Sequence, residues 1–183
     1  AGGSWQPRVQ ARMLIKVASL YAQAGTRKRA SAILEKALAR AEKMEDESRQ
    51  PRLFGAVAVA HLKLGNERGV EEVVKRIVAA RNRLMHEKVY RARDKGDMAL
   101  EDISRAYAGR GQYDEAAGVA EKMRISHLRR RMLARILSGR VSALSKDGRY
   151  ETALKLVRSA PPERASRARN TLVKEAIDAG RLD

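Results

Sequence analysis

Four glycines recur along the chain at intervals of 40, 46 and 37 residues, and each is followed five residues later by alanine or valine. Apolar residues at helical spacing lead up to each glycine and resume after it, which predicts two helices folded back on each other at a left-handed turn. The positions are Gly25 with Ala30, Gly65 with Val70, Gly111 with Ala116, and Gly148 with Ala153. A pattern repeated at this period predicts an array of helix pairs.

Polar stretches and helix-start signals predict where each repeat begins and ends. Pro51 follows the polar segment 45–50 and suits the first turn of a helix, where its missing N–H is not needed. Lys95 and Gly96 indicate a helix end, and Asp97 is a favourable N-cap for the next helix. The predicted repeats are residues 8–44, 51–94, 97–124 and 126–160, followed by a capping helix over 163–180, all within one domain.

Composition favours a helical domain that does not span a membrane. The 183 residues are 44% hydrophobic but include few aromatic residues, which suits helices that pack closely through small side chains. No run approaches the roughly 18 apolar residues that a membrane-spanning helix needs. The chain has no cysteine, so it offers no disulfide and no thiolate metal site. Its compartment stays open between the cytoplasm, which is slightly favoured, and the periplasm.

The first four residues, Ala-Gly-Gly-Ser, contain neither an initiator methionine nor a signal pattern. We expect them to be a vector-derived remnant or the cut end of a longer chain, of which this sequence is a fragment.

The formal net charge of +17 predicts attraction to anionic partners. Acidic protein segments, nucleic acid and anionic membrane surfaces all fit that charge. The charge indicates what the protein associates with and leaves its oligomeric state open.

The repeated pattern resembles the tetratricopeptide repeat (TPR) family. That family places an aromatic residue four positions before the turn glycine, and small residues seven before and five after it. The aromatic position is filled by Tyr21 and Tyr107, and in two divergent units by His61 and Leu144. The resemblance implies an all-α right-handed superhelix, a TPR-like solenoid of about four helix pairs plus a C-terminal capping helix.

The resemblance also places a row of basic residues on the concave face of the array. In the family, inner-face positions lie thirteen and two residues before each turn glycine. These offsets select Arg12, Arg52, Arg135 and Arg167, together with Lys63 and Lys146. Arginines in one row can pair bidentately with carboxylates, so we expect them to bind an acidic or extended segment of a partner protein. The alternative is that they are ordinary solvated charges on a basic surface.

A second basic feature keeps nucleic acid open as an alternative partner. His127, Arg131 and Arg135 follow one another at a spacing of four, which makes one charged stripe on a helix. Such a stripe can contact phosphates. The related pentatricopeptide repeats bind single-stranded RNA, and Met123 matches the methionine that they place twelve residues after the glycine. Few aromatic residues lie beside the stripe to stack bases.

No catalytic, metal or cofactor site is expected. The three histidines are far apart in sequence, and the chain has no phosphate-binding glycine loop and no serine or cysteine nucleophile motif. The carboxylate clamp of the TPR family needs an asparagine where Ser19 and Val59 stand, so that clamp is not expected either. The sequence therefore predicts a non-enzymatic interaction scaffold or adaptor.

Overall fold

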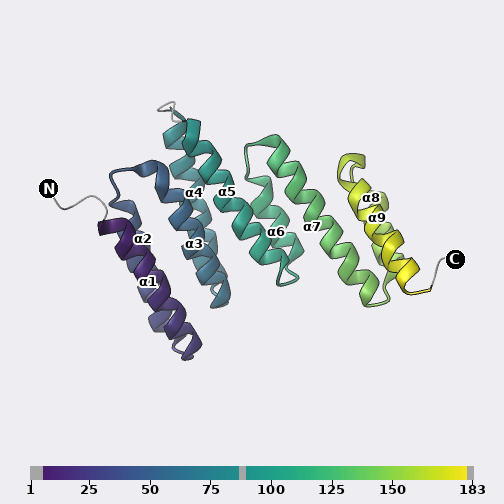
Figure 1. Cartoon of the computed structure of the whole chain (residues 1–183), viewed down its shortest axis with the longest axis horizontal. Coiled ribbons are helices and arrows are strands. Elements are labelled where there is room, and N and C mark those ends of the chain that lie inside the picture. Colours follow the sequence, from purple (N-terminus) through teal and green to yellow (C-terminus); the bar gives the residue numbers. More distant parts are fainter. Residues whose placement is uncertain (1–5, 87–89, 181–183) are drawn as a thin grey trace. The chain divides into compact units, whose positions relative to one another are not determined.

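A computed structural model of the chain describes residues 6–86 and 90–180, and within them the regular structure is entirely helical (Figure 1). The helices are α1 (Gln6–Gln23), α2 (Arg27–Glu42), the 3-10 helix η1 (Glu47–Arg49), α3 (Gln50–Lys63), α4 (Glu67–His86), α5 (Tyr90–Ala108), α6 (Tyr113–Glu121), α7 (Ser126–Lys146), α8 (Tyr150–Ser159) and α9 (Pro162–Asp178). The predicted all-α architecture is confirmed.

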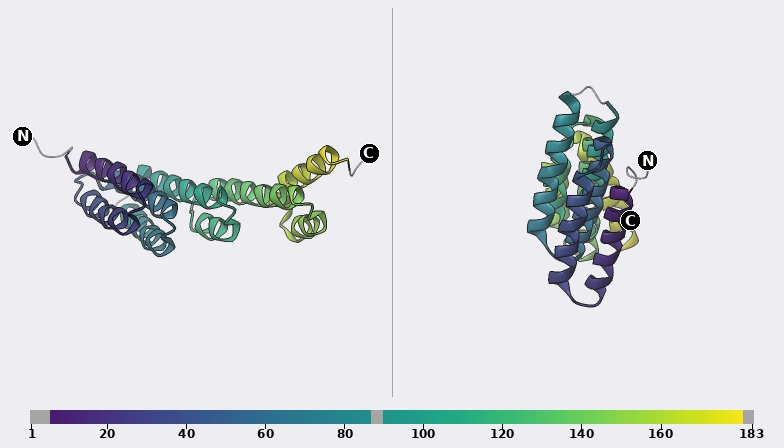
Figure 2. Two further views of the ribbon diagram at one scale, coloured as in Figure 1. Left: turned by 90° about the horizontal axis from the view of Figure 1, so that it is seen from below. Right: turned by 90° about the vertical axis from the view of Figure 1, so that its left-hand side faces the viewer.

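The chain divides into two compact units, Ala1–Ala106 and Tyr107–Asp183. In the first unit α1 packs on α2 and α3 packs on α4, and α3 also contacts α1 and α2. In the second unit α7 packs on α6, α8 and α9. Figure 2 shows the helices of each unit arranged in two layers. The pairing of neighbouring helices confirms the predicted repeat architecture, while the grouping of all residues into one domain stays a prediction.

The turns between paired helices are made by the predicted glycines. Gly25, Gly65, Gly111 and Gly148 have φ between 72° and 77°, in the left-handed region that a side chain disfavours. At each turn the N–H after the glycine donates to the carbonyl four residues before that glycine; Thr26, for example, donates to Tyr21 O at 2.9 Å. This bond satisfies a carbonyl that the ending helix would otherwise leave without a partner.

The residue five after each glycine lies where the second helix crosses the first. Ala30, Val70, Ala116 and Ala153 are at most 1% exposed, so each of these predicted positions belongs to the core. In the second unit Ala153 packs with Val141, Val157 and Ala168 in a cluster built from α7, α8 and α9. Small side chains at the crossing let the helix axes approach closely, which sets the spacing of the pair.

The predicted helix boundary at residues 95–97 is wrong. Lys95, Gly96 and Asp97 lie inside α5, which begins at Tyr90, so Asp97 is not an N-cap. A Cβ at Gly96 would meet the side-chain carbons of Arg81 at 3.1 Å. The glycine therefore gives room for the Arg81 side chain from α4, and it does not end a helix.

Arg81 and Asp97 form a buried ion pair between α4 and α5. Arg81 Nη1 lies 2.8 Å from Asp97 Oδ1, and the two side chains are 4% and 0% exposed. Because an unpaired charge at this depth is costly, the pair ties α5 to α4.

We expect Asp97→Ala to lower the free energy of unfolding by about 3 kcal/mol or more, since it leaves a buried guanidinium without its carboxylate. Urea denaturation measures the loss. The control is Glu47→Ala, which breaks the exposed ion pair of Glu47 with Arg83 (3.0 Å) and should cost less than about 1 kcal/mol. An equal loss of unfolding free energy in the two variants would contradict the view that the buried Arg81–Asp97 pair stabilises the fold more than an exposed pair does.

His61 is fully buried at the end of α3 in a polar network. Its Nδ1 lies 3.1 Å from the amide nitrogen of Asn66, which can only donate, so Nδ1 accepts and the ring is neutral. Asn66 also donates to Ser31 Oγ and accepts from the N–H of Gly69. Burial lowers the pKa of His61, and the nearby Glu35 carboxylate opposes this shift.

A lowered pKa for His61 predicts that stability falls in acid. The unfolded chain binds a proton at His61 near the ordinary pKa of 6.5 and the folded chain does so only at lower pH, so the free energy of unfolding should decrease as pH drops below about 6.5. Urea denaturation between pH 5 and 8, roughly the range in which histidine titrates, gives the slope of the unfolding free energy against pH. His61→Phe should make this slope smaller. The control, His127→Ala on the surface of α7, should keep the wild-type slope; an unchanged slope in His61→Phe would contradict the prediction.

Candidate functional site

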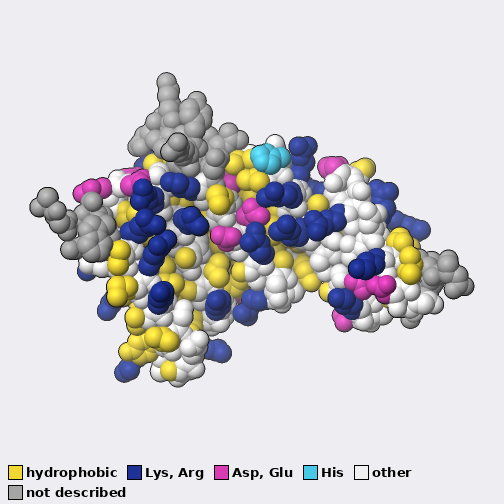
Figure 3. Space-filling model, viewed as in Figure 1, with side chains coloured by type: hydrophobic (Ala, Val, Ile, Leu, Met, Phe, Trp, Pro, Cys, Tyr) yellow, Lys and Arg dark blue, Asp and Glu magenta, His cyan; other side chains and the backbone are white. Residues whose placement is uncertain are grey.

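A groove of roughly 960 Å³ lies on the first unit between α1, α3 and α5. These three helices are the first members of their predicted repeats, and they contribute all the described residues that line the groove. Figure 3 shows Lys and Arg side chains gathered over this part of the molecule, with hydrophobic side chains between them.

Most of the described residues that line the groove are apolar, and we call this apolar part of the lining the floor of the groove. It consists of Val9, Met13, Ile15, Leu53, Ala56, Val59 and Ala106. Val9 and Met13 are 39% and 61% exposed, and together with Val17 and Leu20 they form an exposed apolar stripe along α1. A contiguous apolar strip on the surface marks a place where another molecule can bury it.

The charged part of the described lining, which we call the rim of the groove, is mainly cationic. Arg12, Lys16, Arg52 and Arg105 form it, with Asp102 as the carboxylate among the described lining residues. Arg105 is already paired with Glu101 at 2.9 Å and with Asp102 at 3.5 Å. Arg12 and Arg52 are exposed and have no hydrogen-bond or ion-pair partner among the described residues, so their guanidinium groups are free to bind a ligand.

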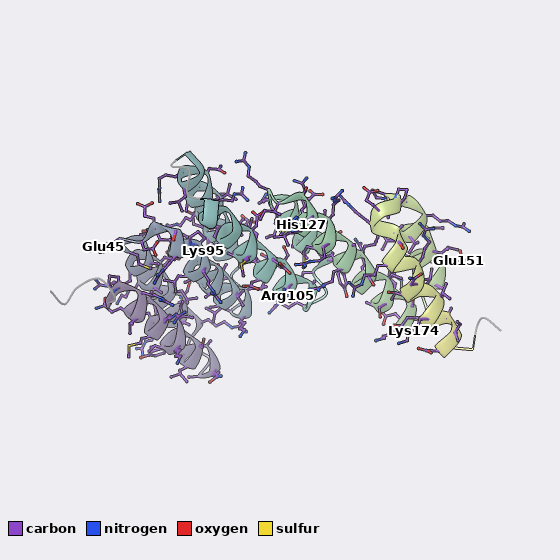
Figure 4. The ribbon with its side chains drawn as sticks, turned by 45° about the horizontal axis from the view of Figure 1, so that its top comes forward. Glu45, Lys95, Arg105, His127, Glu151 and Lys174 are labelled. Carbon is purple, nitrogen blue, oxygen red and sulfur yellow. The ribbon has the colours of Figure 1, made fainter. Side chains whose placement is uncertain are left out.

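A second pocket, of about 330 Å³, adjoins the groove and shares Arg12, Arg52 and Leu53 with it. Arg8, Arg49 and Lys95 complete the lining, which includes no Asp or Glu among the described residues. The pocket therefore brings five cations from α1, η1, α3 and α5 to one place; we call it the basic pocket. Figure 4 labels Lys95 and Arg105 on α5, where Lys95 lines the pocket and Arg105 lines the groove.

Two of the five cations are held by a small network on the loop before α3. Arg49 Nε lies 2.6 Å from Asp46 Oδ2, Ser48 Oγ donates to Asp46 Oδ1, and Lys95 Nζ donates to Ser48 Oγ at 3.0 Å. The hydrogen bond from Ser48 lowers the pKa of Asp46, with added help from the charges of Arg49 and Lys95. The carboxylate therefore stays ionised and fixes Arg49 and Lys95 beside the pocket.

The position of α5 at the groove depends on a close helix contact. A Cβ at Gly55 of α3 would meet the Cβ and Cα of Ala99 at 3.0 and 3.2 Å. Only glycine lets the two helices approach to this distance without a shift. The Arg81–Asp97 pair holds the opposite side of α5, so both contacts set the width of the groove.

The structure brings together two of the predicted partner-binding residues, Arg12 and Arg52. Lys63 is exposed near the end of α3 and lines a separate small pocket with Ala18, Ser19 and Leu34. In the second unit Arg135 and Lys146 of α7 and Arg167 of α9 are exposed. Lys146 Nζ lies 4.0 Å from Glu175 Oε1. A common row for all of these residues stays a prediction.

The predicted basic stripe lies on one helix and faces solvent. His127, Arg131 and Arg135 are exposed along α7, which has no acidic residue between Ser126 and Lys146. Its function stays a prediction.

Several residues of the site were not predicted. Arg8 and Lys16 flank the predicted Arg12 at a spacing of four on α1, a signal that was present in the sequence. Arg49 and Lys95 carry no such signal, because they reach the pocket from the short helix η1 and from a helix whose start the sequence placed wrongly.

None of the helices is long and apolar enough to cross a membrane, over the part of the chain that the structure describes. Within residues 6–86 and 90–180, no group of three His, Cys, Asp or Glu side chains is placed to hold a metal ion.

Comparison with known proteins identifies the fold. The chain matches no protein-family model and no curated protein. A single-residue variant of a candidate kinesin light chain from Podosopora anserina, a protein with nearly identical TPR-like repeats, has a TM-score of 0.50 and 19% sequence identity, over 98% of this chain and 90% of that chain. The chain has a TPR-like helical-repeat fold. The parent Podosopora structure gives a TM-score of 0.47 and 20% identity over 93% and 87% of the two chains.

The Gly55 contact gives a test of how the TPR-like helices around the groove are held. We expect Gly55→Val to lower the free energy of unfolding by about 1–3 kcal/mol, because the added methyl groups overlap Ala99. The matched control is Gly118→Val on α6, where a Cβ would meet nothing within 4 Å; it should change stability by less than about 0.5 kcal/mol. Urea denaturation compares them, and a neutral Gly55→Val would show that α5 is not held by this contact.

Proposed function

We propose that this chain is a non-enzymatic interaction module, a scaffold or adaptor whose groove on the first unit binds an acidic or extended segment of another protein. The observation that carries the proposal is the combination of an apolar floor with free cations at the rim, where Arg12 and Arg52 flank Val9, Met13 and Val59. Apolar side chains of a partner would bury on the floor, and its carboxylates would pair with the two guanidinium groups.

The lining of the groove supports binding over catalysis. Its described titratable side chains are Arg12, Lys16, Arg52, Asp102 and Arg105, and the single carboxylate is paired with Arg105. None of these groups forms a nucleophile paired with a base, which is the arrangement that covalent catalysis requires. The chemistry available in the groove is charge pairing and apolar burial.

A second candidate function rests on the stripe of His127, Arg131 and Arg135. Because α7 carries six Lys or Arg residues and no acid, this helix can also attract the phosphates of nucleic acid. The stripe lies on the second unit, so the two candidates can be separated by substitution.

Fluorescence polarisation with degenerate dodecapeptide libraries tests the groove. One library alternates Glu with apolar residues, a second alternates Lys with apolar residues, and a third alternates Glu with Gly or Ser. We expect the first library to bind the most tightly, because it alone supplies both carboxylates and apolar side chains. Arg12→Glu with Arg52→Glu should weaken that binding roughly tenfold.

The control variant is Arg135→Glu with Arg167→Glu, which makes the same charge change on the second unit and should keep the wild-type affinity. Equal weakening in the two variants would show that only total charge matters, and the groove would not be the site. Preferential binding of single-stranded RNA that is lost in the control variant, with a steep dependence on salt, would favour the stripe on α7 instead.

A further inference from the structure

The basic pocket beside the groove has more positive charge than binding a single carboxylate needs. Arg8, Arg12, Arg49, Arg52 and Lys95 line about 330 Å³, and Asp46 neutralises one of these charges by pairing with Arg49. Three of the five, Arg8, Arg12 and Arg52, have no recorded partner among the described residues. Like charges at this density repel one another, so a bound anion would stabilise the arrangement.

The backbone adds to the positive potential of the pocket. Arg8 lies in the first turn of α1, Arg52 in the first turn of α3 and Lys95 in the second turn of α5. The amino ends of α1 and α3 carry partial positive charge from the helix dipole, an effect that falls off beyond the first turn and so adds little at Lys95. Helix dipoles and side-chain cations therefore act in the same direction on an anion in the pocket.

The number and type of cations match a phosphate monoester better than a carboxylate. A phosphorylated serine or threonine carries about −1.5 to −2 charge and three acceptor oxygens. Each free guanidinium presents a planar fork of donors, so three arginines can serve three oxygens at once. A single carboxylate has one charge and two oxygens, so it neutralises fewer of these cations and offers fewer acceptor sites.

The surroundings of the pocket favour a peptide as the carrier of the phosphate. Arg12, Arg52 and Leu53 line both the pocket and the apolar groove, so a chain that leaves the pocket enters the groove directly. The described lining of both contains no aromatic residue, so it offers no platform on which nucleic-acid bases could stack. Apolar side chains of a peptide fit the floor, whereas a sugar-phosphate backbone does not.

We propose that the basic pocket binds a phosphoserine or phosphothreonine side chain within an extended peptide, whose neighbouring apolar side chains lie in the groove. The proposal rests on the function proposed for the groove and names the anionic group that it recognises. Arg8, Arg12 and Arg52 bind the phosphate, while Arg49 and Lys95, tethered through Asp46 and Ser48, provide fixed positive charge beside it.

The test compares three degenerate nonapeptide libraries that share random apolar flanks and differ only at the central residue, which is Ser, Glu or phosphoserine. Fluorescence polarisation gives the affinity of the full chain for each library. We expect the phosphoserine library to bind at least about tenfold more tightly than the Ser and Glu libraries. The triple variant Arg8→Gln, Arg12→Gln and Arg52→Gln should remove this preference.

A matched variant controls for the loss of three positive charges. Lys155→Gln, Arg158→Gln and Arg169→Gln change three exposed cations of α8 and α9 in the second unit and should keep the full phosphoserine preference. Circular dichroism and thermal melting confirm that both variants fold. As a milder substitution, Arg12→Lys keeps the charge but loses the planar fork, and should reduce the preference severalfold in a protein of unchanged stability.

The outcomes separate this inference from the function on which it rests. Equal binding of the phosphoserine and Glu libraries would overturn the phosphate assignment and leave the groove as a site for acidic segments. Failure of all three libraries, together with the acidic apolar dodecapeptides, would overturn both proposals. A single-stranded oligonucleotide that binds more tightly than the phosphopeptides, and no longer binds to the triple variant, would assign the pocket to nucleic acid. That result would overturn the proposal that a phosphopeptide is the ligand.

Discussion

Close packing of each helix against its neighbour at a small, fully buried residue is the constraint from which the fold follows. Ala30, Val70, Ala116 and Ala153 each lie one turn into a helix that has just reversed direction at a left-handed glycine. The glycine allows the sharp reversal, and the small residue lets the returning helix lie against the one before it. Because the same two features recur at each turn, the chain can bury a core with few aromatic residues.

This mode of packing leaves one surface of the first unit open to a ligand. The second helices α2 and α4 bury their apolar faces against α1 and α3, and the opposite faces of α1, α3 and α5 line the groove. The width of the groove depends on α5, which Gly55 and Ala99 bring close to α3 and which the Arg81–Asp97 pair ties to α4. The buried contacts thus set the distance between the cations of α1 and α3 and those of α5.

The first unit offers apolar and cationic side chains at different places on its surface. Apolar side chains such as Val9 and Met13 remain exposed along α1, while Arg8 and Arg12 on the same helix line the basic pocket. An extended ligand can therefore be recognised by burial at one point and by charge at another. Charge pairing gives specificity and speeds association, and apolar burial supplies affinity that salt does not screen. The sequence has Ser19 and Val59 where the carboxylate clamp of the TPR family needs asparagine, so the proposed recognition rests on the arginines.

The helix pairs, the turn glycines and the buried crossing residues could be read from the sequence, because helical periodicity and left-handed turns depend on residues close together in the chain. Of the candidate site, the same reading found Arg12 and Arg52, since an offset from the turn glycine places both on first helices. It failed where distant residues decide the local structure. Lys95, Gly96 and Asp97 look like a helix end and a cap, yet Arg81 from α4 pairs with Asp97 and fills the space beside Gly96, so the helix continues. The basic pocket depends on that continuation, because tertiary packing brings Lys95 of α5 beside Arg8, Arg49 and Arg52. These residues are far apart in sequence, so no spacing along the chain predicts that they lie together.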